Sequence, residues 1–135
     1  KAVGAGECRI SVVNTYYIGR MLGSGNPADV AAAEKTGLIF PNQAGRGTHV
    51  NISGAGVMKY APDRENAIRF LEFLTSDWAQ NALTERNHEY TVVPGIMKKS
   101  PVPGTGAFKE DKLNASALGE NQAEAVRIYD RVGWQ

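Results

Sequence analysis

Short apolar segments alternate with helix-forming segments along this chain, and this alternation constrains the fold more than any other feature. Apolar or half-polar runs typical of β-strands lie at 9–13, 38–40, 48–52, 57–60 and 89–93. Helical patterns occupy much of the sequence between and after them. Strands and helices in alternation predict a sheet with helices on its faces. We therefore expect an α/β fold.

Three helix starts are marked by side chains that can accept a hydrogen bond from the first helical turn. They are Asn26, Asp63 and Ser76. The helix that begins after Asn26 is expected to stop at Gly37, a residue type favoured just past a helix end. A last helix is expected over roughly 120–132, where apolar residues recur at helical spacing.

The composition argues against several classes of protein. Fifteen Lys and Arg residues balance 14 Asp and Glu residues, so the chain lacks the basic excess typical of nucleic-acid-binding proteins. Hydrophobic residues make up 42% and charged residues 21%, which predicts a globular chain. No apolar run approaches the roughly 20 residues of a membrane-spanning helix. Cys8 is the only cysteine, and we expect it to be a buried, unreactive thiol.

Two adjacent tyrosines, Tyr16 and Tyr17, follow the first apolar run, where an expected strand gives way to a turn or a helix start. A phenolate is a hard anionic oxygen ligand, and such ligands suit hard cations such as Fe(III). A free phenol has a pKa of about 10, but a bound trivalent ion displaces its proton. The ordinary interpretation is that one ring packs in the core and the other lies on the surface. The surrounding sequence favours a metal site instead.

Several stretches form a recognisable set: Gly6-Glu7-Cys8, Asn14-Thr15-Tyr16-Tyr17, Phe40-Pro41-Asn42-Gln43, the run GTHVNISGAGV from Gly47 to Val57, Glu89-Tyr90, and the closing Asp130-Arg131-Val132-Gly133-Trp134. With them the chain resembles, over nearly its whole length, the periplasmic ferric-ion-binding proteins, which are the soluble receptors of bacterial iron ABC transporters. The tyrosine motif is the most specific for function, and the stretch 49–57 is the most specific for the family.

The resemblance implies a type 2 periplasmic-binding fold, in which two α/β lobes close on the ion and the chain crosses between them more than once. Residues 1–46, with the tyrosine pair, are expected in the C-terminal lobe. Residues 47–97 are expected in the N-terminal lobe, and 98–135 are expected to form a hinge and the final C-lobe helices. Family members run to roughly two ordinary domains. The chain is therefore expected to be the C-terminal part of such a protein, without its N-terminal portion.

The resemblance also implies the function: capture of Fe(III) in the periplasm and delivery to an inner-membrane ABC permease, with no enzymatic activity. Tyr16 and Tyr17 correspond to the iron-binding phenolates. Asn14 corresponds to a residue that contacts an accompanying carbonate or phosphate, and a role as a helix cap is compatible with this. Arg20 is interpreted as a solvated surface charge in preference to an anion contact. The remaining iron ligands are expected upstream of residue 1.

Three alternatives stay open. The same fold could serve another solute, such as an anion or a sugar, although a neutral solute has no need of paired phenolates. An enzyme domain is a second alternative, but no nucleophile, base and orienting group occur together. The third is a fragment that binds no metal tightly by itself, because two ligands hold a metal poorly. Such a fragment is expected to self-associate and bury an exposed sheet.

Overall fold

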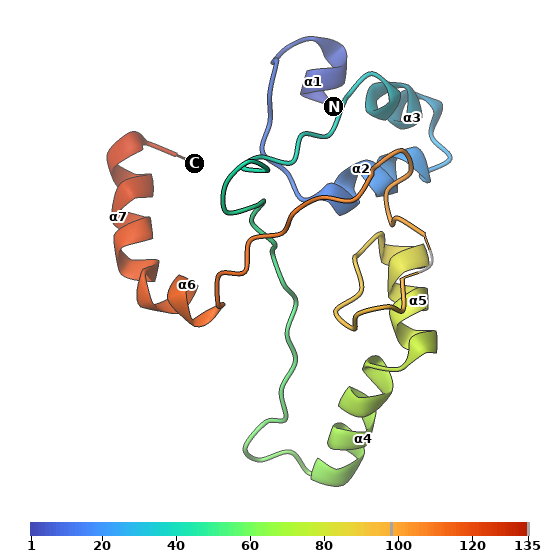
Figure 1. Cartoon of the computed structure of the whole chain (residues 1–135), viewed down its shortest axis with the longest axis vertical. Coiled ribbons are helices and arrows are strands. Elements are labelled where there is room, and N and C mark those ends of the chain that lie inside the picture. Colours follow the sequence, from blue (N-terminus) through green and yellow to red (C-terminus); the bar gives the residue numbers. More distant parts are fainter. Residues whose placement is uncertain (98, 135) are drawn as a thin grey trace. The chain divides into compact units, whose positions relative to one another are not determined.

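The computed structural model describes residues 1–97 and 99–134. Within this range the chain forms seven helices (Figure 1). Contacts divide the chain into two compact units. The first consists of Lys1–Ile39 and Asn51–Ala107, and the second of Phe40–Val50 and Phe108–Gln135. The helices are α1 (Ala2–Ala5), α2 (Thr15–Leu22), α3 (Pro27–Glu34), α4 (Arg64–Leu74), α5 (Asp77–Asn87), α6 (Ser116–Glu120) and α7 (Gln122–Val132).

The first unit contains α1 to α5, and its helix contacts support the tyrosine pair. Helix α2 packs against α3, α3 also contacts α1, and α4 contacts α5. Among the described residues, the buried apolar side chains are Ala33, Ala79, Pro101 and Val102, all in this unit. The expected lobe assignments of 1–46, 47–97 and 98–135 concern a whole two-lobed protein, and they stay a prediction.

The three expected helix starts are confirmed. Each cap side chain accepts a hydrogen bond from a backbone N–H in the first turn, which satisfies a donor that has no partner within the helix. Two other helix boundaries, the end of α3 and the start of α7, differ from expectation. The distances from cap oxygen to backbone nitrogen are 2.9 Å from Asn26 to Ala28, 3.0 Å from Asp63 to Asn66 and 3.3 Å from Ser76 to Ala79.

Helix α3 ends at Glu34, earlier than the expected stop at Gly37. The reason is Thr36, whose backbone N–H and hydroxyl both donate to the carbonyl oxygen of Ala33, at 3.0 and 2.8 Å. These bonds close the last turn before the glycine is reached. No helix in the described ranges is long and apolar enough to cross a membrane.

The last expected helix is found as α7, which ends at Val132 and is followed by the C-cap residue Gly133, with a backbone φ of 63°. Its start is two residues later than expected, because Asn121 separates it from the short helix α6. The sequence pattern did not predict α6. Both helices belong to the second unit, in which they contact each other.

The expected strands do not form in the part of the chain that the structure describes. The β-pairing found there is one isolated parallel bridge between Thr48 and Glu110. A strand is stabilised by hydrogen bonds to a neighbouring strand, and these segments have no such neighbour among the described residues. Their apolar side chains are consequently exposed: Ile10 is 80%, Val12 86% and Ile39 81% exposed. Cys8, expected to be buried, is exposed as well.

The second unit is held together by hydrogen bonds between its two segments. The Thr48 N–H donates to the Lys109 carbonyl at 2.8 Å, and the Asp111 N–H donates to the Thr48 carbonyl at 2.8 Å. The Gln43 side chain accepts from the Lys109 N–H at 2.7 Å and donates to the Lys109 carbonyl at 3.0 Å. These bonds are local to the unit and do not involve the tyrosine pair.

The expected hinge lies in the Pro- and Gly-rich stretch 98–106, and the described residues of this stretch belong to the first unit. Its first residue, Lys98, lies outside the described residues. Pro101 and Val102 are buried, and the hydroxyls of Ser100 and Thr105 donate to the Val102 carbonyl at 3.0 and 2.7 Å. The ring nitrogen Nδ1 of His88 lies 2.9 Å from the Pro101 carbonyl oxygen. A hinge role for this stretch stays a prediction.

Candidate metal centre

The tyrosine pair lies in the first turn of α2. Asn14 is the N-cap residue, with φ −72° and ψ 143°, so the chain passes from extended to helical conformation at this residue. Of the two possibilities left open by the sequence, a turn or a helix start, the structure has the helix start, although the strand expected before it does not form. The two rings lie 4.5 Å apart between centroids, at an angle of 42°. Tyr17 is 49% exposed, so solvent reaches its side chain.

The Asn14 side chain contacts Tyr16 instead of capping the helix. Its amide nitrogen Nδ2 donates to the Tyr16 phenol oxygen at 3.2 Å, and it makes no side-chain cap hydrogen bond. The expectation of a capping role is therefore wrong for the side chain, although Asn14 does occupy the cap position. An anion contact of Asn14 is not tested by this structure and stays a prediction.

The two phenols of the pair have unequal proton affinities. The pKa of Tyr16 lies below the ordinary value, first because of a hydrogen bond from Tyr17, then because of the bond from Asn14 and the charge of Arg20; burial and the charge of Glu89 act in the opposite direction. The pKa of Tyr17 is raised, mainly because its proton is engaged in the hydrogen bond to Tyr16. Without a metal, the pair therefore favours loss of the first proton from Tyr16.

Arg20 contributes to this electrostatic environment. Its guanidinium carbon lies 4.9 Å from the centroid of the Tyr16 ring. A guanidinium over an aromatic face is attracted by the ring electrons. The interpretation of Arg20 as a merely solvated charge therefore missed this contact. The spacing of four residues between Tyr16 and Arg20, which places both on one helix face, was the available signal.

Helix α2 approaches His88 closely at Gly19. A Cβ built on Gly19 would lie 2.5 Å from the His88 Cγ, so the ring occupies the space that any side chain there would need. His88 follows the last residue of α5 and has a φ of 61°. The position of His88 in the sequence gave no sign that its ring would pack against Gly19. The contact places a fixed group beneath the helix that carries the tyrosines.

The candidate donors for a metal at this position are the two phenol oxygens of Tyr16 and Tyr17, whose role as ligands stays a prediction. Within residues 1–97 and 99–134, no group of three or more His, Cys, Asp or Glu side chains could hold a metal ion. Two phenolates are hard donors that partly neutralise a trivalent cation. A complete coordination sphere requires further donors.

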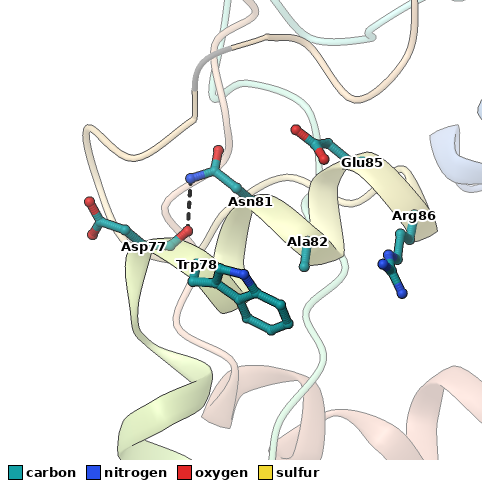
Figure 2. A pocket seen from close by; sticks show the side chains of 6 residues that line it. All are labelled: Asp77, Trp78, Asn81, Ala82, Glu85 and Arg86. Atoms are coloured by element: carbon teal, nitrogen blue, oxygen red, sulfur yellow. Dashed lines mark hydrogen bonds between the residues drawn. The ribbon is translucent and has the colours of Figure 1, made fainter.

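A surface hollow of about 400 Å³ lies elsewhere, along one face of α5 (Figure 2). In Figure 2 the Asn81 side chain points to the Asp77 carbonyl, to which it donates at 2.7 Å. Trp78, which also lines the hollow, is 68% exposed. None of the lining residues belongs to the tyrosine pair. The residues are Asp77, Trp78, Asn81, Ala82, Glu85 and Arg86.

Comparison with curated proteins finds relatives that concern iron. No protein-family model matches the chain. Iron uptake protein A1 of Synechocystis sp. is 47% identical over 135 residues, covering 100% of this chain and 38% of the relative. The major ferric iron-binding protein of Neisseria meningitidis serogroup B is 26% identical over 133 residues, covering 98% of this chain and 39% of the relative. The chain thus spans about two fifths of the length of these relatives.

The solved structures that match this chain are also those of iron-binding proteins. The structure of Trichodesmium (IdiA) (FutA) in complex with iron and citrate ligands matches with a TM-score of 0.93 and 50% identity, over 100% of this chain and 43% of that one. The ferric binding protein from Campylobacter jejuni matches with a TM-score of 0.91 and 43% identity, over 99% of this chain and 42% of that one. The backbone therefore follows one part of these proteins, although strand pairing is nearly absent from the described residues. The expected family resemblance and fold class, part of a two-lobed binding protein, are confirmed.

Proposed function

We propose, from homology with the ferric-iron-binding proteins over the whole length of this chain, that it is the C-terminal part of a periplasmic receptor for Fe(III). The receptor captures the ion and delivers it to an inner-membrane ABC permease. The observation that carries this proposal is the pair of adjacent phenols, Tyr16 and Tyr17, at the start of α2. The names of the relatives describe iron uptake and ferric iron binding, and none of those reported above describes an enzyme.

In this proposal, Tyr16 and Tyr17 hold Fe(III) through two phenolate oxygens. The lowered pKa of Tyr16 supports this, because the surroundings of its oxygen already favour the charged form. Both phenols lose their protons when the ion binds, so affinity falls as the pH falls. Further ligands come from parts of the receptor outside this chain.

An accompanying anion, such as carbonate or phosphate, fits next to Asn14. A side-chain amide has two N–H donors, and one of those of Asn14 is directed to Tyr16. The other is available to an anion bound beside the metal. The backbone N–H groups at the start of α2 favour negative charge at the same place.

The test is the visible absorption band that arises when a phenolate transfers charge to Fe(III). Ferric citrate is added to the chain and to the variants Tyr16→Phe and Tyr17→Phe, and the spectra are compared after removal of free iron. We expect the band in the unaltered chain, a weaker band in each variant and none in the double variant. Tyr60→Phe is the matched control, because Tyr60 is highly exposed and lies outside the pair. An unaltered band in the double variant would falsify the assignment.

A further inference from the structure

The side chain of Asn14 does not cap its helix, in contrast to those of three other N-cap residues. Asn26, Asp63 and Ser76 each use a side-chain oxygen to accept a hydrogen bond from their own helix. The side-chain oxygen Oδ1 of Asn14 makes no such bond. The cap bond is the ordinary use of such an oxygen, but here a different group binds it.

That group is the side chain of Asn51. Its amide nitrogen Nδ2 lies 3.5 Å from the Asn14 Oδ1 and donates to it, while the Asn14 Nδ2 donates to the Tyr16 phenol oxygen at 3.2 Å. Asn51 and Asn14 are 37 residues apart in the sequence and belong to the same compact unit. The three side chains form a row of two hydrogen bonds, in which Asn51 donates to Asn14 and Asn14 donates to Tyr16.

We propose that Asn51 is a positioning residue of the ferric site: by occupying the oxygen of the Asn14 amide, it turns the amide nitrogen toward the Tyr16 oxygen. The amide has an acceptor end and a donor end, so whichever group binds one end determines what the other end presents. The consequence for iron rests on the proposed function of the tyrosine pair.

The direction of the amide matters because Tyr16 is the proposed ligand. An N–H directed at a phenolate makes a charge-assisted hydrogen bond and stabilises the metal-bound form. An amide oxygen in the same place would repel the phenolate. Residues that hold a metal ligand by hydrogen bonds commonly affect metal affinity by about 10- to 100-fold. At 3.5 Å the contact of Asn51 is long, so we expect an effect at the lower end, about tenfold.

Two substitutions of Asn51 separate orientation from simple packing. Asn51→Leu removes the donor and leaves the Asn14 amide without a fixed direction. Asn51→Asp replaces the donor by an acceptor, so the Asn14 amide should reverse and present its oxygen to Tyr16. Ser53→Asp is the matched control, because it adds the same charge two residues further along the same exposed segment. Asn51→Gln keeps the donor and should restore much of the original arrangement.

The first readout needs no iron. The side-chain amide signals of Asn14 are recorded by ¹⁵N–¹H NMR in the unaltered chain, and Tyr16→Phe identifies the contribution of the phenol oxygen. We expect both Asn51→Leu and Asn51→Asp to shift these signals, while Ser53→Asp leaves them in place. If the Asn14 signals are the same in the unaltered chain, Asn51→Leu and Asn51→Asp, the proposal is overturned, whatever iron does.

The second readout is the Fe(III) charge-transfer band and the affinity measured from it by citrate competition. Loss of a donor to the phenolate makes charge transfer easier, so the band should move to longer wavelength in Asn51→Leu and further in Asn51→Asp. Affinity should fall by about tenfold and by more than that, respectively. Band and affinity in Asn51→Asp equal to those of Ser53→Asp would overturn the proposal. Absence of a band in the unaltered chain would count against the proposed function, and the NMR readout then decides the role of Asn51 separately.

Discussion

Replacing Gly19 by alanine should loosen α2, the helix that carries the tyrosine pair. The new Cβ would lie 2.5 Å from the Cγ of His88, 2.7 Å from its Cβ and 2.8 Å from its Nδ1. The ring cannot move aside freely, because its Nδ1 is hydrogen-bonded to the Pro101 carbonyl at 2.9 Å. Either the ring leaves that carbonyl or α2 shifts.

The expected magnitude follows from two opposed effects. Alanine is favoured over glycine inside a helix by about 1 kcal/mol. Forcing additional atoms into a filled space costs about 1–3 kcal/mol. In the unaltered chain the two effects should leave Gly19→Ala neutral to destabilising by about 2 kcal/mol. In a chain that carries His88→Gly the ring is absent, so Gly19→Ala should stabilise α2 by about 1 kcal/mol. In the His88→Gly variant, glycine accepts the φ of 61° at residue 88 without strain.

The assay is amide hydrogen exchange of α2 in the unaltered chain, the two single variants and the double variant. Exchange reports the local free energy of opening, and each 1.4 kcal/mol or so corresponds to about a tenfold change in rate. We expect the effect of Gly19→Ala on α2 to reverse its sign when His88 is replaced. If the effect of Gly19→Ala is the same in both backgrounds, the ring of His88 does not limit the space at residue 19, and the reasoning is refuted.

Two further predictions concern protons and the second unit. Tyr16 should titrate below the ordinary pKa of about 10 and Tyr17 above it, in two steps seen by ¹³C NMR of labelled tyrosine, and Tyr17→Phe should raise the pKa of Tyr16 by removing its largest cause. The folding stability contributed by the Tyr16 shift is present above pH 10 or so and is lost as the pH falls through the folded pKa of Tyr16. The folding stability contributed by the Tyr17 shift is present below pH 10 or so and is lost as the pH rises through the folded pKa of Tyr17. A single shared step would contradict this. Gly47→Ala should break the bridge between Thr48 and Glu110 and speed exchange of the Thr48 and Asp111 amides, because φ at Gly47 is 104° and a Cβ there would lie 2.6 Å from the Glu110 carbonyl. Gly45→Ala is the control, because a Cβ at residue 45 has room. Equal amide exchange in both variants would disprove the close approach.

The local features of the helices could be predicted from the sequence. Asn26, Asp63 and Ser76 begin helices as expected, because a cap acts on backbone groups two or three residues away. The tyrosine pair was expected where a strand gives way to a turn or a helix start, and the structure has the helix start, at Thr15, without the strand. The strand predictions were wrong for the described residues, because a strand is stable only where another chain segment pairs with it.

The sequence by itself therefore determined where the three side-chain-capped helices begin, that two phenols, Tyr16 and Tyr17, stand next to each other, and which family the chain resembles. Only the tertiary structure decided what surrounds the pair. Asn51 and His88 reach α2 from segments distant in the sequence, and neither spacing nor composition announces such contacts. Capping and helix periodicity depend on neighbours within one or two turns, whereas the direction of the Asn14 amide and the room beside Gly19 depend on segments that folding brings together.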